Sequence, residues 1–170
     1  MADIVIADLP PMTRFIVRGD APAASAIGTT FGVSLPREAC RAAVRGERAA
    51  LWLGPDEWLL LAPEVDAAPL AATLGAALGG ARASIVEVSD RQVAMSVSGP
   101  RATEVLNAFN ALDLHVAAFP VGMCTRTRFN KAEIVLWRTA PDTFHIEVWR
   151  SFGPYVAGCL AEAAREFVGA

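Results

Sequence analysis

The 170-residue sequence has few of the residues that build metal centres and disulfide scaffolds, with only two histidines and three cysteines. Cys40, Cys124 and Cys159 are odd in number, far apart and without a Cys-x-x-Cys pair. This spacing indicates buried free thiols rather than a disulfide framework or a zinc site. Because His115 and His145 are the only histidines, a His-rich metal centre is excluded.

Long hydrophobic runs are also missing, although 54% of the residues are hydrophobic. Even the apolar stretch 51–62 is interrupted by the turn sequence Gly-Pro-Asp-Glu at 54–57. A membrane-spanning helix needs roughly 18 to 20 consecutive apolar residues. The opening Met1-Ala2-Asp3 lacks the basic and apolar regions of a secretory signal. We therefore expect a cytoplasmic protein with no membrane partner.

Nucleotide-binding motifs are absent as well. There is no G-x-G-x-x-G between an early strand and a helix, and no G-x-x-x-x-G-K-[ST] loop. The nearest cluster, Gly75, Gly79 and Gly80, lies within and after a predicted helix, where capping explains it. Fifteen basic and eighteen acidic residues give a net charge of −3, which provides no general attraction to nucleic acid or anionic lipid. The expected partner is a protein or a small molecule.

Hydrophobic periodicity in the first half of the chain predicts the order β-α-β-β-α-β. The predicted elements are a strand at 13–18, a helix at 21–30, an extended segment at 31–35, a hairpin of 48–53 with 58–62, a helix at 66–79 and a strand at 84–88. We expect Asp66 to cap the second helix and Gly79-Gly80 to end it.

The same kind of pattern in the second half predicts a strand at 91–98. A helix follows, with Pro100 at its first position and its end near Leu112. Three strands follow, at 123–129, 132–138 and 143–149, separated by turn residues. Ser151 is the expected N-cap of a last helix that carries an apolar face from Phe152 to Phe167.

Hairpins rather than repeated β-α-β crossovers point to antiparallel sheets covered by helices, so the predicted fold class is α+β. We divide the chain into a first half, residues 1–82, and a second half, residues 83–170, which together form one compact unit. The seam is placed at 79–83, and the repeated Gly-Pro pairs at 54–55 and 99–100 suggest an internal repeat.

Two histidine-containing groups are candidates for chemistry. In an alternating strand, His145 shares a face with Thr143, Glu147 and Trp149, so a His–Glu pair across one pleat step is possible. The alternative is a polar strand face at solvent or at a subunit contact. His115, two residues after Asp113, could bind a ligand or simply satisfy backbone groups.

Basic and aromatic residues offer candidate binding surfaces. Arg126, Arg128 and Arg138, with Lys131 nearby, could form a strip that holds a carboxylate or an acidic partner surface, or could be an ordinary solvated sheet face. The four tryptophans could be core residues or interface anchors: Trp52, Trp58, Trp137 and Trp149. With no convincing nucleophile, cofactor cradle or metal site, the pattern favours a binding or structural role, and we assign no catalytic, cofactor-binding or metal residue.

The order of several short motifs resembles the gamma subunit of heterotetrameric sarcosine oxidase over roughly residues 50 to 168. The motifs are Leu-Gly-Pro-Asp-Glu-Trp-Leu-Leu at 53–60, Val-Ser-Asp-Arg at 88–91, Val-Ser-Gly-Pro-Arg-Ala at 97–102, Leu-Asp-Leu at 112–114, Phe-Pro-Val-Gly at 119–122 and Trp-Arg-Ser-Phe at 149–152. The resemblance implies the fold of the aminomethyltransferase folate-binding domain, with two packed ferredoxin-like halves.

This resemblance also implies a function. The chain would be a non-catalytic subunit that supports oxidation of sarcosine to glycine, with hydrogen peroxide and a folate-captured one-carbon unit as further products. Its partners would be the alpha, beta and delta subunits, and the larger ones would hold FAD, FMN, NAD and tetrahydrofolate. The Tyr-Thr-Gly-Glu-type segment of aminomethyltransferases has no counterpart at 138–144. The alternatives are a free-standing folate-binding or aminomethyltransferase-like module, and a gamma-type subunit of a related N-methyl amine oxidase.

Overall fold

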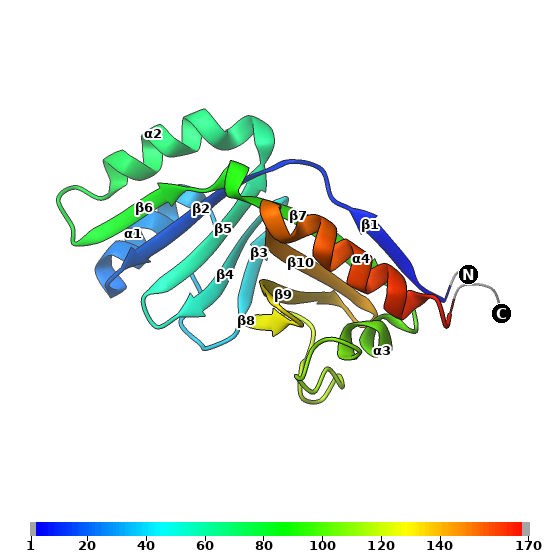
Figure 1. The fold of residues 1–170 in the computed structure, drawn as a ribbon. Helices are drawn as coiled ribbons and strands as arrows, with labels where there is room; N and C mark the ends of the chain where they lie inside the picture. The colour runs from blue at the N-terminus through cyan, green and yellow to red at the C-terminus, as the bar shows by residue number, and fades with distance from the viewer. Residues whose placement is uncertain (1–2, 168–170) are drawn as a thin grey trace. The chain divides into compact units, whose positions relative to one another are not determined.

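The computed structural model describes residues 3–167, which divide into two compact units. One unit contains residues 11–89, and the other contains residues 3–10 together with residues 90–167. Each unit has one five-stranded antiparallel sheet (Figure 1). The predicted α+β class, with antiparallel sheets covered by helices, is confirmed. The expectation of no secretory signal was based partly on Met1 and Ala2, which lie outside the described residues.

The unit of residues 11–89 has the ferredoxin-like order of elements with one extra strand. Its sheet order is β3-β4-β5-β2-β6, and both helices pack on the same face. Its elements are β2 (Met12–Gly19), α1 (Ala21–Phe31), β3 (Ala42–Arg45), β4 (Arg48–Gly54), β5 (Glu57–Pro63), a short 3-10 turn (Glu64–Asp66), α2 (Ala67–Ala77) and β6 (Ala83–Glu87).

The other unit repeats this arrangement with a different chain order. Its sheet order β1-β7-β10-β9-β8 matches β6-β2-β5-β4-β3 strand for strand, except that the N-terminal strand β1 takes the place that β6 holds after α2. Its elements are β1 (Val5–Asp8), β7 (Gln92–Ser98), α3 (Ala102–Asn107), β8 (Cys124–Phe129), β9 (Ala132–Ala140), β10 (Thr143–Trp149), a 3-10 turn (Arg150–Phe152) and α4 (Gly153–Ala164). The internal repeat is therefore visible in the topology.

Local sequence explains where α1 begins and ends. The Asp20 side chain accepts a hydrogen bond from the backbone N–H of Ala23 at 3.0 Å, and a proline stands in the first turn. At the other end Gly32 adopts φ +83°, and its N–H donates to the carbonyl of Gly28. These caps determine the first and last residues of the helix.

Each sheet buries alternate residues against its own two helices. Phe15, Val17, Trp58 and Leu60 are buried in the first unit with apolar residues of α1 and α2. In the other unit, buried residues of β7, β9 and β10 pack against buried residues of α3 and α4. The strand residues are Met95, Val97, Ile134, Leu136, Phe144, Ile146 and Val148, and the helix residues are Val105, Leu106, Val156 and Leu160. The strand alternation read from the sequence thus selects the core faces correctly.

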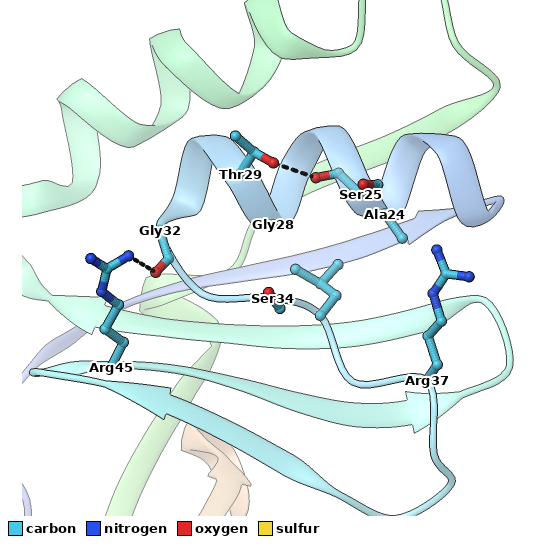
Figure 2. Close-up of a pocket in the computed structure, with 9 residues that line it drawn as sticks. Ala24, Ser25, Gly28, Thr29, Gly32, Ser34, Arg37 and Arg45 are labelled. Atoms are coloured by element: carbon cyan, nitrogen blue, oxygen red, sulfur yellow. Dashed lines mark hydrogen bonds between the residues drawn. The ribbon is translucent and has the colours of Figure 1, made fainter.

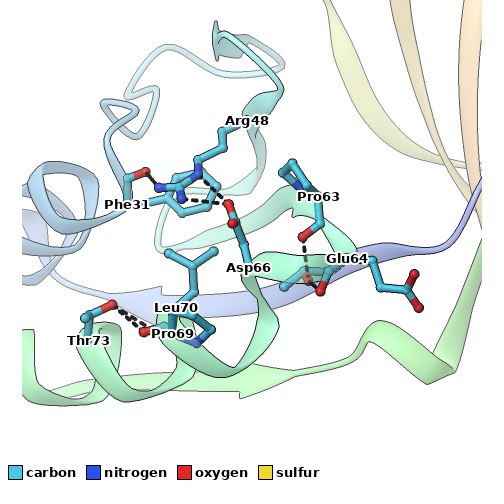
Figure 3. A network of polar contacts seen from close by, with 9 residues as sticks. Phe31, Arg48, Pro63, Glu64, Asp66, Pro69, Leu70 and Thr73 are labelled. Atoms are coloured by element: carbon cyan, nitrogen blue, oxygen red, sulfur yellow. Dashed lines mark hydrogen bonds and ion pairs between the residues drawn. The ribbon is translucent and has the colours of Figure 1, made fainter.

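Asp66, the N-cap residue of α2, links this helix to β4 and α1 through Arg48. Its carboxylate accepts hydrogen bonds from Nε and Nη2 of Arg48 at 3.1 and 2.7 Å, and it makes no capping hydrogen bond to α2 (Figure 3). Arg48 also donates to the carbonyl of Phe31 at 2.8 Å and stacks over the Phe31 ring. Asp66 thus stands at the predicted N-cap position, but its side chain does not cap α2, because its backbone is already helical (φ −85°, ψ −5°) after the preceding 3-10 turn.

Several other boundaries differ from the predictions. Residues 32–35 form no strand after the αL residue Gly32, and α3 ends at Asn107 rather than near Leu112. Pro100 lies in the turn before the Arg101 cap of α3 and not at its first position. Ser151 lies inside a 3-10 turn, so Phe152 is the residue that precedes α4.

The predicted division between residues 82 and 83 separates β6 from the strand with which it pairs. Phe15 to Gly19 of β2 are in register with Glu87 to Ala83 of β6, so the first unit extends to residue 89. The short strands β1 and β3 were not predicted. The packing of the halves into one compact unit stays a prediction.

Gly99 allows the N-terminal strand to join its sheet. It adopts φ +120°, and a Cβ placed there would lie 2.5 Å from the carbonyl oxygen of Asp3. The backbone N–H of Arg101 donates to this same carbonyl at 3.1 Å. Only glycine combines this dihedral angle with so close a backbone approach.

Gly99→Ala is therefore expected to lower the free energy of unfolding by about 2 kcal/mol, as measured by urea denaturation. Gly46→Ala is the matched control, because Gly46 has φ +60° but no atom lies within 4 Å of the place that an alanine methyl would take. It should lose only about 1 kcal/mol. Equal losses in the two variants would contradict the role of the close approach.

Candidate partner-binding surface

His145 and Glu147 form the predicted pair. Nε2 of His145 lies 2.8 Å from Oε1 of Glu147, on the face of β10 opposite Phe144, Ile146 and Val148. The solvent-facing alternative is wrong, because His145 is 7% exposed and Glu147 is fully buried. The Trp137 ring packs against the His145 imidazole, with 5.7 Å between the ring centres. The hydrogen bond between the imidazole and the buried carboxylate stays within β10, whereas the contact between His145 and Trp137 joins β10 to β9.

His115 and Asp113 serve the backbone of the loop between α3 and β8. The Asp113 carboxylate accepts from the N–H of His115 at 2.9 Å, and Nδ1 of His115 accepts from the N–H of Ala117 at 3.3 Å. Both side chains are exposed. The interpretation that this Asp-x-His group satisfies backbone groups is confirmed.

The predicted basic strip does not include Arg138. Arg138 is in register with Phe144 and is 4% exposed, whereas Arg126 and Arg128 lie exposed on the opposite face of the sheet. Its guanidinium donates to the carbonyls of Leu114 and Phe119 at 2.9 and 2.8 Å and to the carbonyl of Pro141. Because Ala132, Ile134, Leu136 and Arg138 alternate along β9, the parity of the strand was a signal that this arginine points to the core.

The three cysteines are free, as predicted, and Cys124 is fully buried. Cys40 and Cys159 are partly exposed rather than buried. Cys40 also has a positive φ of 59°. Within residues 3–167 no three His, Cys, Asp or Glu side chains gather in a way that could hold a metal ion. No helix of the described chain is long and apolar enough to cross a membrane.

Tyr155, the single tyrosine of the chain, packs against the core from α4. Burial of its phenol raises its pKa above the ordinary value, and the neighbouring Cys159 thiol adds to this increase. The folded chain therefore keeps the phenol proton at a pH where the unfolded chain has lost it. The contribution of Tyr155 to stability is complete below the unfolded pKa of about 10 and is lost as pH rises through the higher folded pKa.

We expect the near-ultraviolet phenolate absorbance of the native chain to titrate with a midpoint above about 10, higher than that of the same chain in urea. Tyr155→Phe should abolish this absorbance change and flatten the alkaline loss of stability. A native midpoint equal to or below the urea value would contradict the assignment.

The four tryptophans have different surroundings. Trp58 is 3% exposed and its indole N–H donates to the carbonyl of Pro36 at 2.7 Å, while Trp52 and Trp137 are partly buried. Trp149 is 48% exposed. Of the four tryptophans, Trp149 is therefore the candidate interface anchor.

Trp149 belongs to an exposed group that we call the aromatic–arginine patch: Arg91, Trp149, Arg150 and Phe152. The Arg91 guanidinium lies 5.5 Å from the centre of the Trp149 ring, and this stacking restricts the orientation of the indole. Phe152 is 41% exposed in the 3-10 turn that follows β10. Within residues 3–167, no carboxylate forms an ion pair with Arg91 or Arg150.

The composition of the patch is that of a protein interface. Tryptophan and arginine are the residues most enriched in interface hot spots, and exposed aromatic rings beside unpaired guanidinium groups suit an apolar partner surface rimmed by carboxylates. Sequence inspection named Trp149 but missed the arginines, since nothing in a single sequence shows which guanidinium groups lack a carboxylate.

Comparison with known proteins gives a family match over almost the whole chain. Residues 18–166 match the model of the sarcosine oxidase, gamma subunit family. A sarcosine oxidase subunit gamma from Corynebacterium sp. (strain P-1) is 37% identical over 145 residues, which cover 84% of this chain and 70% of that protein. The same subunit from Arthrobacter sp. is 34% identical over 144 residues, covering 84% and 70%.

Solved structures agree with the sequence comparisons. A chain of the heterotetrameric sarcosine oxidase from Corynebacterium sp. U-96, in complex with pyrrole 2-carboxylate, is similar with a TM-score of 0.91 and 29% identity, covering 98% of this chain and 86% of that chain. Glycine cleavage system aminomethyltransferase T from Bartonella henselae is similar with a TM-score of 0.71 and 17% identity, over 94% of this chain and 45% of that chain. The second likeness shows a shared fold, as predicted.

Proposed function

Because the chain belongs to the sarcosine oxidase gamma subunit family, we propose that it functions as the gamma-type subunit of a heterotetrameric sarcosine oxidase. The observation that carries this proposal is the close match, over nearly all of this chain, to one chain of a solved heterotetrameric sarcosine oxidase. The alpha, beta and delta subunits are the partners that this proposal implies.

In this assembly the chain contributes binding surface rather than reacting groups. The enzyme oxidises sarcosine to glycine, releases hydrogen peroxide and passes the one-carbon unit to tetrahydrofolate. The FAD, FMN, NAD and folate sites belong to the partner subunits, and the assembly works in the cytoplasm.

The aromatic–arginine patch is our candidate for contact with a partner subunit. Trp149 supplies an apolar anchor, and Arg91 and Arg150 supply positive charge that a partner carboxylate would complement. The likeness to aminomethyltransferase T supports no separate folate function, since it is a likeness of fold at 17% identity.

The proposal is tested by omitting this chain from the assembly. The partner subunits would be produced with and without it, purified, and compared for subunit composition, flavin absorbance, thermal stability and sarcosine-dependent peroxide formation. We expect a stable active complex only when the chain is present. A fully active, stable complex of the other subunits that never binds the chain would refute the proposal.

A further inference from the structure

A cavity beside α1 in the unit of residues 11–89 has an unusual balance of charge. Its volume is about 390 Å³, within the range of small-molecule sites. Three hydroxyl residues line it, together with two arginines and no acidic residue: Ser25, Thr29, Ser34, Arg37 and Arg45. The lining therefore carries a net positive charge.

The two arginines are available to a ligand. Arg37 is exposed and makes no side-chain hydrogen bond or ion pair within residues 3–167. Arg45 is also exposed, and its Nη1 donates one long hydrogen bond of 3.4 Å to the carbonyl of Gly32. Figure 2 shows them at opposite ends of the cavity, with Ser34 between them and α1 along one wall. A ligand that engages both must carry anionic groups at both ends.

Local backbone structure holds the cavity in shape. Gly28 is buried in α1, and a Cβ there would lie 3.1 Å from the carbonyl oxygen of Val33 and 3.2 Å from the N–H nitrogen of Leu35. Its lack of a side chain lets segment 33–35 lie directly against the helix. The indole N–H of Trp58 donates to the carbonyl of Pro36 at 2.7 Å, which fixes the chain immediately before Arg37. The backbone wall formed by α1 and segment 33–36 is therefore preformed.

We propose that this cavity binds a small organic dianion, a dicarboxylate or a phosphorylated carboxylate, with one anionic group on Arg37 and the other on Arg45. Guanidinium groups pair with both carboxylate and phosphate, and the hydroxyl of Ser34, which also lines the cavity, can donate a further hydrogen bond. A cavity of this volume suits a small molecule better than a flat protein surface. This binding is independent of the proposed assembly and adds a ligand site to the chain itself.

The test uses the full chain, with glutarate as the dicarboxylate probe and acetate and inorganic phosphate as comparators. The binding signal is the NMR chemical shift of the Trp58 indole N–H, assigned with the help of Trp58→Phe. This N–H reports on the site because it donates to the carbonyl of Pro36, the residue before Arg37. We expect a saturable shift with glutarate, a much weaker response to acetate, and loss of affinity as salt increases.

Arg37→Gln and Arg45→Gln should each weaken glutarate binding about tenfold, and the double variant should abolish it. Arg82→Gln is the matched control, since Arg82 is an exposed arginine of the same unit that does not line this cavity, and it should leave binding unchanged. Circular dichroism checks that each variant is folded.

No saturable shift, or equal shifts in wild type and double variant, would overturn the proposal. So would a third outcome, in which glutarate gives no shift but the double variant loses its partner subunits. That result would mean that the anionic groups come from a protein.

Discussion

Replacing Arg138 by methionine is expected to lower the free energy of unfolding by about 3 kcal/mol. The guanidinium satisfies carbonyls of Leu114, Phe119 and Pro141, which come from a loop before β8 and from the turn after β9. Its Cζ also lies 4.8 Å from the centre of the Phe144 ring. Methionine fills much of the space but donates no hydrogen bond, so buried carbonyl oxygens are left without partners.

Urea denaturation of the wild type, Arg138→Met and Arg128→Met measures this effect. Arg128 is the matched control because it is an exposed arginine on the adjacent strand β8. Its replacement should change stability by less than about 0.5 kcal/mol. A loss below about 1 kcal/mol for Arg138→Met would show that the loop carbonyls find other partners and that the arginine does not organise the loop.

Trp149→Ala is expected to weaken the binding of this chain to its partner subunits by about 30-fold or more, which corresponds to about 2 kcal/mol. The indole is nearly half exposed and held by Arg91, so it can bury a large rigid surface at little cost in side-chain entropy. The chain's own stability should change little. Surface plasmon resonance with the immobilised partner complex gives the affinity.

Val116→Ala is the control for this prediction, because Val116 has a similar exposure of 49% in the same unit but lies outside the aromatic–arginine patch. It should leave affinity within about threefold of the wild type. If Trp149→Ala behaved like Val116→Ala, the patch would not be the interface, although the proposed assembly could still stand on other contacts.

Strong local signals made most of the fold predictable from the sequence. The hairpin of β4 and β5 has Pro55 and Asp56 at its turn, and alternation along β7, β9 and β10 identifies their buried faces. Strands β1 and β3 have only four residues each, too few for a pattern of period two to stand out. The pairing of β1 with β7 joins residues far apart in the chain, and no local pattern encodes such a contact.

The candidate sites were predictable to different degrees. The contact between His145 and Glu147 follows from strand geometry, because residues two apart share a face. Their burial does not follow, since two polar residues on one strand face usually suggest solvent. Arg37 and Arg45 belong to no motif in the sequence, and only the fold brings segment 32–37 and the end of β3 to one cavity beside α1.

The most direct test of the central claim is a tagged pull-down of this chain from its native host, with mass spectrometry of the co-purifying proteins and assays of flavin absorbance and sarcosine-dependent peroxide. We predict recovery of two large flavoprotein-type subunits and one small further subunit, with activity. Recovery of the chain alone, colourless and binding folate, would contradict the account and favour a free-standing folate-binding module.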